Sequence, residues 1–167
     1  MSRSFHSLSL ATALSLAIAG LAGTAPSTAH AYDPASTSAI NVEAGAVILH
    51  GDDPVAHFTV DKPTMGDARF TSSHGGATYR FASAANLTQF QANPEMYTPA
   101  FGGYCAMGAA LGKKLDVDPT QFKVVGGMLY LNVNADVFKK WSEDVPRNIA
   151  KANANWPAIK DKAASAL

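Results

Sequence analysis

The chain of 167 residues is poor in cysteine and carries no excess charge of either sign. Its single cysteine, Cys105, cannot close an internal disulfide, so a disulfide-stapled scaffold is excluded. The 13 basic residues equal the 13 acidic residues in number. Because a neutral chain is not drawn to phosphates by its net charge, we expect no nucleic-acid partner and no binding to anionic membranes.

The sequence also lacks the short signatures of the common enzyme classes and zinc sites. Histidine, cysteine and glutamate occur at none of the spacings that hold zinc, such as Cys-x-x-Cys or His-x-x-x-His. There is neither a glycine loop of the kind that cradles phosphate nor a Gly-x-Ser-x-Gly elbow. These absences exclude several enzyme classes without selecting one, and they favour a protein that is not an enzyme.

What is present begins with an export signal. Arg3 supplies a positive charge, residues 8–21 are apolar or small, and Ala29-His30-Ala31 fits the small-x-small cleavage pattern. The uncharged stretch is too short and too rich in serine, threonine and glycine to favour a membrane anchor. We therefore predict a cleavable signal peptide over residues 1–31, a periplasmic or secreted mature chain, and no membrane insertion after cleavage.

The mature chain is expected to form one domain over residues 46–159. A loosely held lead-in over residues 32–45 and a frayed tail over residues 160–167 flank this domain. Two glycine pairs, Gly75-Gly76 and Gly126-Gly127, each separate runs of β-branched and aromatic residues, which predicts two β-hairpins. Beyond the two hairpins we find no internal repeat.

Short helices are predicted after each hairpin. Ser83 and Asn134 are favourable N-cap residues for helices over residues 84–92 and 135–143. A last helix over residues 147–155 follows, with a proline suited to its first turn and a Trp-Pro pair to end it.

Two segments before the first hairpin carry weaker signals. The apolar run 46–50 favours a buried strand, and residues 55–60 favour extended or turn-like structure. Strands and helices do not alternate as they do in β-α-β units. The pattern therefore predicts an α+β fold, a small single domain with two hairpins packed against several short helices.

An unpaired thiol in an exported chain is buried, bound to something or reactive. Cys105 can pack as a small apolar residue beneath the neighbouring glycine segment. Its thiolate can instead be a soft ligand for Cu(I) or zinc, with His57 and Met107 as partners. A third interpretation makes Cys105 a nucleophile with His57 as its base. Cys105 and Met107 would share a face on a strand but not on a helix.

Several separated motifs resemble the YHS-domain family, and more closely its exported, single-domain branch. The resemblance covers about residues 41–159, and its motifs occur in the same order along the chain. The segments that carry it are Gly51-Asp-Asp-Pro-Val-Ala-His-Phe58, Ser73–Ser83, Phe90–Tyr97, Gly102-Gly-Tyr-Cys-Ala-Met107 and Val124–Asn132, together with the ending from Trp141 to Pro157.

The resemblance implies an association with heavy-metal handling, since YHS domains occur as segments of copper-transporting ATPases. The cysteine-bearing members carry thiols at the positions that match Ala56, Ala82 and Asn86. All three thiols are missing in this chain, so the ordinary metal site of those members is not carried over. The branch also commonly has tyrosine where this chain has His57. His57 therefore either adds a group able to bind a metal or is simply another packing residue of aromatic size.

The leading hypothesis is a periplasmic YHS-like binding protein that handles a soft transition metal such as copper. Cys105 would be the principal ligand, with His57 and Met107 beside it. The alternative is a binding module without a metal, which docks a periplasmic protein or a small ligand. A thiol enzyme that depends on Cys105 is the third hypothesis.

Overall fold

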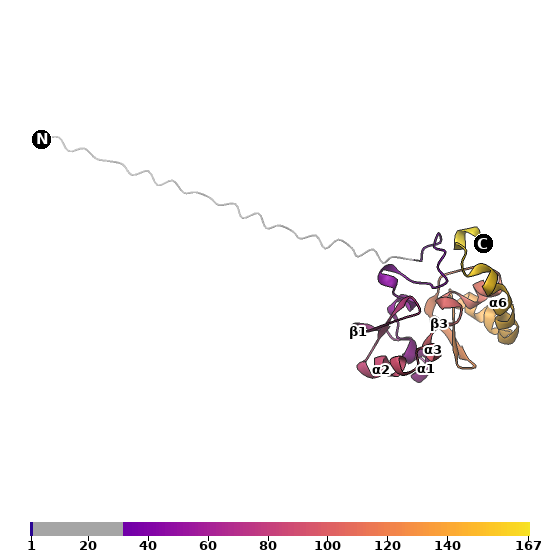
Figure 1. The fold of residues 1–167 in the computed structure, drawn as a ribbon, viewed down its shortest axis with the longest axis horizontal. Coiled ribbons are helices and arrows are strands. Elements are labelled where there is room, and N and C mark those ends of the chain that lie inside the picture. The colour runs from indigo at the N-terminus through magenta and orange to yellow at the C-terminus, as the bar shows by residue number, and fades with distance from the viewer. Residues whose placement is uncertain (2–31) are drawn as a thin grey trace.

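The structure, a computed structural model, describes Met1 and residues 32–167 (Figure 1). Apart from Met1, the predicted signal peptide lies outside the described residues. The described part contains six α-helices and two antiparallel two-stranded sheets, so the predicted α+β fold is confirmed. None of its helices has both the length and the apolar character needed to cross a membrane.

The helices and strands follow one another in two series of the same order. The first series is η2 (Leu49–Gly51), α1 (Pro54–Thr59), β1 (Asp67–His74), β2 (Ala77–Phe81), α2 (Ala84–Ala92) and α3 (Pro94–Tyr97). The second series is η3 (Ala100–Gly103), α4 (Ala106–Ala110), β3 (Asp118–Val125), β4 (Met128–Asn132), α5 (Ala135–Ser142) and α6 (Val145–Ile159). Two further 3₁₀ turns, η1 (Ala44–Ala46) and η4 (Ala164–Ala166), lie outside both series.

The two series match at a spacing of 51 residues, and we call residues 49–97 the first repeat and residues 100–159 the second. In each hairpin a register shift leaves three residues of the longer strand without a partner. The expectation of no repeat beyond the hairpins is therefore wrong. The counterparts include Asp67 and Asp118 at the hairpin starts, Gly75 and Gly126 in the turns, and Ser83 and Asn134 at the helix caps.

The same pairs of elements are in contact within each repeat. Helix α1 contacts β2, α2 and α3, and α4 contacts β4, α5 and α6 in the same way. Phe90 in α2 and Trp141 in α5 are counterparts, and both side chains are fully buried. Helix α1 also contacts β3, which brings the first repeat against the second hairpin.

The predicted hairpins and the helices capped by Ser83 and Asn134 are confirmed. The last helix is longer than expected, because Pro157 lies inside α6 instead of ending it. The carbonyl oxygen of Lys160, just after α6, accepts a hydrogen bond from Lys114 Nζ. The Lys114 ammonium therefore lies at the C-terminal end of α6, where the helix dipole favours a positive charge. This interaction stabilises the helical turn that follows the proline.

Two predictions for the segments before the first hairpin are wrong. The run 46–50 does not form a strand, because Leu49 and His50 have φ angles of 59° and 53°, in the left-handed region that a strand cannot use. Residues 55–60 mostly form α1 instead of extended structure. Pro54 suits the first turn of this helix, and the Asp53 carboxylate caps it by accepting the N–H of Val55 at 2.8 Å.

The segments 32–45 and 160–167 are held more firmly than the sequence suggested. The Lys114 side chain is buried, and its Nζ donates to the carbonyl oxygens of Ser38, Lys160 and Lys162 at 2.6, 3.1 and 2.8 Å. The N–H of Ser165 donates to Pro34 O at 2.8 Å. The lead-in and the tail therefore pack against each other around one lysine, and neither is loosely attached.

Candidate functional site

Cys105 is fully buried at the start of α4, where its side chain caps the helix. Its Sγ accepts the N–H of Gly108 at 3.3 Å, and the thiol donates to Asn132 Oδ1 at 3.7 Å. Burial raises the pKa of the Cys105 thiol, and the backbone N–H groups of Gly108, Val133 and Met107 offset this only in part. A thiol in this environment is a poor nucleophile, which opposes the thiol-enzyme hypothesis.

His57 lies in a different environment. Its ring is buried in α1, with Nδ1 3.0 Å from Asp53 O and Nε2 3.3 Å from Pro119 O. The ring also meets the Phe122 ring edge-on, with the centroids 4.5 Å apart. Both ring nitrogens thus face backbone carbonyl oxygens, and His57 shares none of these partners with Cys105. Within the described residues, no hydrogen bond joins His57 to Cys105.

Met107 follows Cys105 in the first turn of α4, a helix, so the two side chains do not share a face. The half-buried Met107 side chain packs against both core clusters, and its N–H donates to Asn132 Oδ1 at 3.3 Å. In residues 32–167 no three His, Cys, Asp or Glu side chains form a group that could hold a metal ion.

The positions at which the resemblance places cysteines converge on one buried carboxylate. Asp53 is fully buried, and its Oδ2 accepts the N–H of Ala82 at 2.8 Å and the side-chain amide of Asn86 at 2.6 Å. Its Oδ1 accepts the N–H groups of Val55 and Ala56. Three of these four hydrogen bonds come from the positions at which the resemblance places cysteines, Ala56, Ala82 and Asn86. No sequence signal indicated this role of Asp53, because two of its partners lie in a later segment of the chain.

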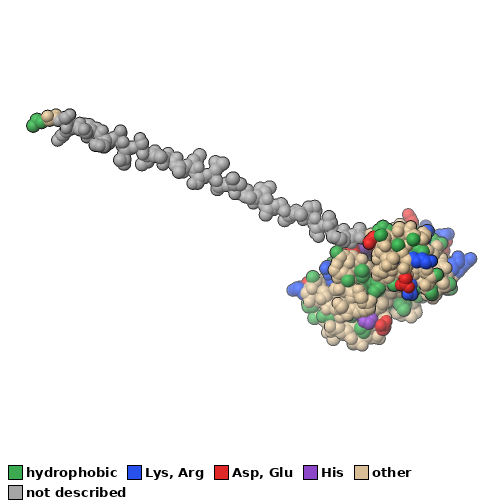
Figure 2. All heavy atoms as spheres, turned by 45° about the horizontal axis from the view of Figure 1, so that its top comes forward, with side chains coloured by type: hydrophobic (Ala, Val, Ile, Leu, Met, Phe, Trp, Pro, Cys, Tyr) green, Lys and Arg blue, Asp and Glu red, His purple; other side chains and the backbone are tan. Residues whose placement is uncertain are grey.

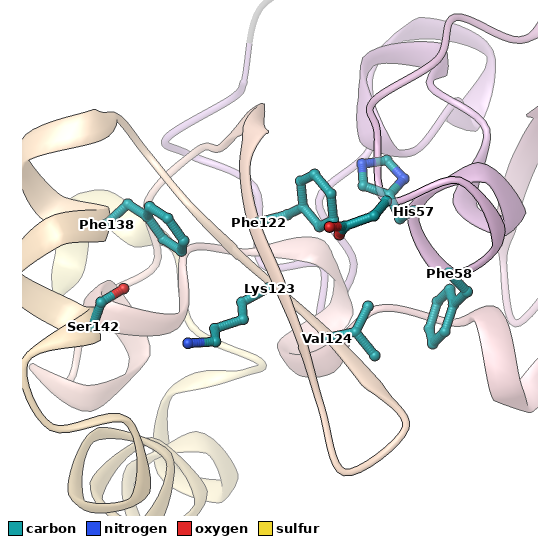
Figure 3. A pocket seen from close by; sticks show the side chains of 8 residues that line it. His57, Phe58, Phe122, Lys123, Val124, Phe138 and Ser142 are labelled. Carbon is teal, nitrogen blue, oxygen red and sulfur yellow. The ribbon is translucent and has the colours of Figure 1, made fainter.

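A hollow of about 560 Å³ opens between α1, β3 and α5 (Figure 3). Three aromatic rings contribute to its wall: Phe58 from α1, Phe122 from β3 and Phe138 from α5. Lys123 points toward the side of Phe138 and Ser142, whereas Val124 on the other side of the strand points toward Phe58. We call this hollow the α1–β3–α5 groove. No sequence pattern indicated this groove, because its wall comes from three separated elements.

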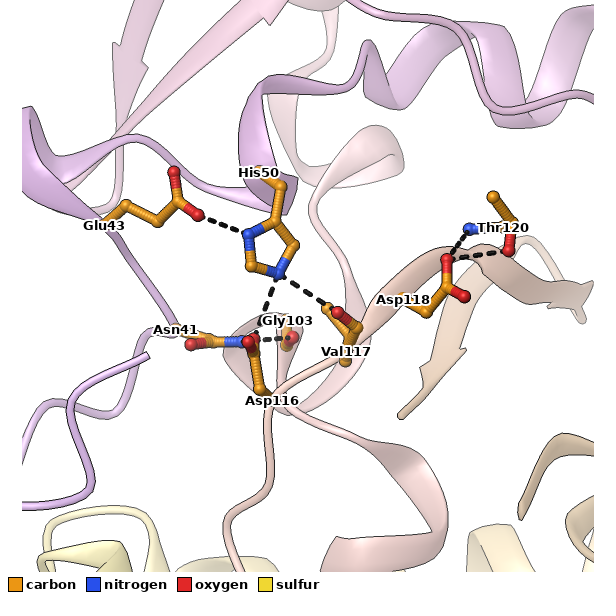
Figure 4. A network of polar contacts seen from close by, with 8 residues as sticks. All are labelled: Asn41, Glu43, His50, Gly103, Asp116, Val117, Asp118 and Thr120. Atoms are coloured by element: carbon orange, nitrogen blue, oxygen red, sulfur yellow. Dashed lines mark hydrogen bonds and ion pairs between the residues drawn. The ribbon is translucent and has the colours of Figure 1, made fainter. Parts of the chain in front are cut away.

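His50 is the centre of a second polar cluster, which joins the lead-in to the second repeat (Figure 4). Its Nδ1 contacts the Glu43 carboxylate, and its Nε2 lies 3.1 Å from Asp116 Oδ1 and 3.0 Å from Val117 O. The hydrogen bond to Asp116, together with the contact to Glu43, raises the pKa of His50 to about 9 despite its partial burial. His50 therefore carries a positive charge at neutral pH, and it links the lead-in to the segment before β3 through these contacts.

The face of the molecule that Figure 2 shows has no comparable concentration of charge. On the face that Figure 2 shows, basic, acidic and apolar side chains are scattered among each other without a continuous patch of one kind. The groove is therefore the feature that most resembles a binding site, because it is concave and combines aromatic walls with a few polar groups.

The comparisons with known proteins add no family assignment. No protein-family model, curated protein or solved structure matches the chain. A function must therefore be argued from the geometry of the site and from the motifs.

Proposed function

We propose that the mature chain is an exported, YHS-like binding module without catalytic activity that takes its ligand in the α1–β3–α5 groove. The observation that carries this proposal is the hollow of about 560 Å³ whose wall includes three phenylalanine rings and Lys123. A hollow of this size is within the range of sites that bind small organic ligands or side chains of a partner.

The chemistry of the wall indicates the kind of ligand. Phe58, Phe122 and Phe138 offer apolar and aromatic surface, and rings of this kind contribute strongly to binding when a ligand covers them. Lys123 is exposed, and in the described part of the chain it forms no hydrogen bond or ion pair through its side chain. The groove therefore suits a ligand with an apolar or aromatic body and an acidic group.

Two further points support the proposed class of protein. The N-terminal pattern predicts export, and a groove-bound ligand would be met outside the cytoplasm. The three positions at which YHS domains carry cysteines surround Asp53, although they are far apart in the sequence. A fold related to YHS domains would have to bring these three positions together, as the fold of this chain does.

The first test uses 8-anilino-1-naphthalenesulfonate, an aromatic acid whose fluorescence rises in apolar surroundings. We expect saturable binding to the mature protein purified from the periplasm. Ser142→Trp fills the groove from an exposed position, and Lys123→Glu reverses its charge, so both should weaken binding. Lys139→Glu on α5 is the matched control, because Lys139 is exposed and lies outside the groove wall. Equal affinity for all four proteins, or no saturable binding, would overturn the proposal.

Copper binding through Cys105, with His57 and Met107, is a separate second proposal. It is favoured by the free thiol and by Met107, whose N–H shares the acceptor Asn132 Oδ1 with that thiol. Because the thiol is buried and His57 has other partners, copper binding would require the start of α4 to rearrange. Titration with Cu(I) against a competing chelator tests it, since equal affinity of the wild type and Cys105→Ser would exclude Cys105 as the ligand.

A further inference from the structure

The floor of the α1–β3–α5 groove is a strand with an open edge. Among the described residues, strand β3 pairs only with β4, and the ladder joins Phe122–Val125 to Met128–Leu131. In an antiparallel pair, alternate residues direct their N–H and C=O groups away from the partner strand. Outside the ladder, no backbone–backbone hydrogen bond of the described residues uses Phe122, Lys123 or Val124. The outer edge of β3 therefore offers unused donors and acceptors beside the groove.

The first hairpin shows how this fold treats another strand edge. The N–H of Ile48 donates to Thr78 O at 3.2 Å, and Val47 forms a bridge with Thr78 in β2. A short extended segment just before the first repeat thus lies against the edge of β2. No described segment pairs with β3 in this way.

The side chains along β3 alternate in character. Phe122 and Val124 are half-buried and apolar, whereas Lys123 between them is exposed. Figure 3 shows Val124 pointing toward Phe58 and Lys123 pointing toward the other side of the strand, where Phe138 and Ser142 lie. A strand added beside β3 would present its own side chains to the same two sides in turn. It therefore needs apolar residues on one side and a residue compatible with Lys123 on the other.

The charge of Lys123 indicates which kind of strand can pair with the outer edge of β3. A second copy of this chain laid antiparallel along the same edge would bring Lys123 near its own counterpart, and an edge lysine of this kind opposes self-pairing. An acidic residue opposite Lys123 would instead form a cross-strand ion pair. Asp61 also lies in the groove wall, at the end of α1. The acidic residue of the partner therefore belongs opposite Lys123, on the side of the strand away from α1.

We infer that the ligand of the groove is an extended polypeptide segment of another protein, in which apolar residues alternate with acidic ones. Its backbone pairs with the outer edge of β3, its apolar side chains cover Phe58, Phe122 and Val124, and its carboxylate meets Lys123. This inference rests on the proposed function, because it specifies the ligand of the same groove.

The test uses fluorescence anisotropy with three labelled, end-blocked peptides on the unchanged mature protein. The first has the sequence Thr-Val-Glu-Val-Glu-Val-Thr, the second has lysine in place of both glutamates, and the third is the first with its alternate amides N-methylated. We expect the glutamate peptide to bind about tenfold more tightly than the lysine peptide. The N-methylated peptide should lose most of the affinity, because it cannot donate to the strand edge.

Variants and the naphthalenesulfonate probe separate the possible failures. Lys123→Glu should reverse the preference between the glutamate and lysine peptides, and Ser142→Trp should abolish binding of both. Equal binding of all three peptides would overturn strand addition. If the peptides fail while the naphthalenesulfonate still binds, the inference falls and the groove proposal stands. If neither binds, both fall. A dimer in sedimentation experiments that Ser142→Trp disrupts would identify a second copy as the occupant and overturn the inference.

Discussion

The two repeats begin their first helices with different buried caps. In the first repeat the Asp53 carboxylate accepts four hydrogen bonds, which join α1 to the end of β2 and to α2. In the second repeat the Cys105 sulfur accepts the N–H of Gly108, and its thiol meets Asn132. Asn132 is itself fully buried, and its side-chain nitrogen lacks a hydrogen-bond partner.

The difference shows how the same chain path is stabilised in two ways. The first repeat relies on a buried charge with every lone pair used, an arrangement that is costly to disturb. The second relies more on apolar burial, with Trp141, Tyr130 and the small residues of α4 packed beneath a long α6. Cys105 is best understood within this comparison, as the helix cap of the repeat that depends less on polar contacts.

The largest expected effect follows from removing the first cap. Asp53→Ala should lower the free energy of unfolding by about 4 kcal/mol, because it leaves buried N–H groups without an acceptor. Cys105→Ala should cost about 2 kcal/mol, since a sulfur is a weak hydrogen-bond partner. Urea denaturation at pH 7 measures both. Equal losses for the two variants would show that the two caps do not differ in the way described.

A second contrast concerns Lys114, whose counterpart in the first repeat is Pro63. The Lys114 ammonium donates to three carbonyl oxygens and lies 4.8 Å from the centre of the Tyr104 ring. Lys114→Met should cost about 3 kcal/mol of unfolding free energy, because the three carbonyl oxygens lose a charged donor.

The matched control for Lys114 is its exposed neighbour. Lys113→Met should change the unfolding free energy by less than about 0.5 kcal/mol, as is usual for surface substitutions. Hydrogen exchange adds a local measurement, since Lys114→Met should speed exchange in both the lead-in and the end of α6. An effect confined to one end would contradict the connection between them.

A third contrast pairs His50 with its counterpart Phe101, and both residues have a φ of 53°. The pKa of His50 is raised to about 9, above its usual 6.5, so its contribution to stability is fully present below pH 6.5. This contribution is lost as the pH rises through 9 and the ring loses its proton. We expect a decrease on the order of 1–2 kcal/mol between pH 6.5 and 9.5, after allowance for partial exposure to solvent.

His50→Phe gives the first repeat the residue that the second repeat has at the matching position, Phe101. It tests whether His50 causes the pH dependence of stability. The variant should be less stable at pH 6.5, and its unfolding free energy should fall less than that of the wild type between pH 6.5 and 9.5. Thermal unfolding across this pH range measures both quantities. An unchanged pH dependence in His50→Phe would show that another group is responsible.

The sequence predicted those parts of the fold that depend on local signals. The glycine pairs at Gly75 and Gly126 and the caps at Ser83 and Asn134 each act within a few residues, and the elements they predict are present. Helix α1 was missed because its cap, Asp53, also depends on partners about thirty positions later in the chain. The repeat was missed because only some counterparts, such as Asp67 and Asp118, are identical, whereas others, such as Phe90 and Trp141, share only their position.

The candidate site could be predicted only in part for the same reason. The sequence singled out Cys105, His57 and Met107 by chemistry, but their positions depend on which elements surround them. Burial of Cys105 and the carbonyl partners of His57 arise from contacts between segments far apart in the chain. Phe58, Phe122 and Phe138 come from three separated elements, so their common groove is a property of the tertiary structure alone.

The smallest expected effect on stability is at the groove itself. Lys123→Glu should change the unfolding free energy by less than about 0.5 kcal/mol, because Lys123 is exposed and forms no ion pair in the described part of the chain. The same substitution should clearly weaken naphthalenesulfonate binding. Asp53→Ala should show the opposite combination. It lowers the stability of the fold, but the protein that stays folded at low temperature should still bind the naphthalenesulfonate. If Lys123→Glu were instead as destabilising as Lys114→Met, Lys123 would be a structural residue, and the groove would lose the charge that makes it a site for an acidic ligand.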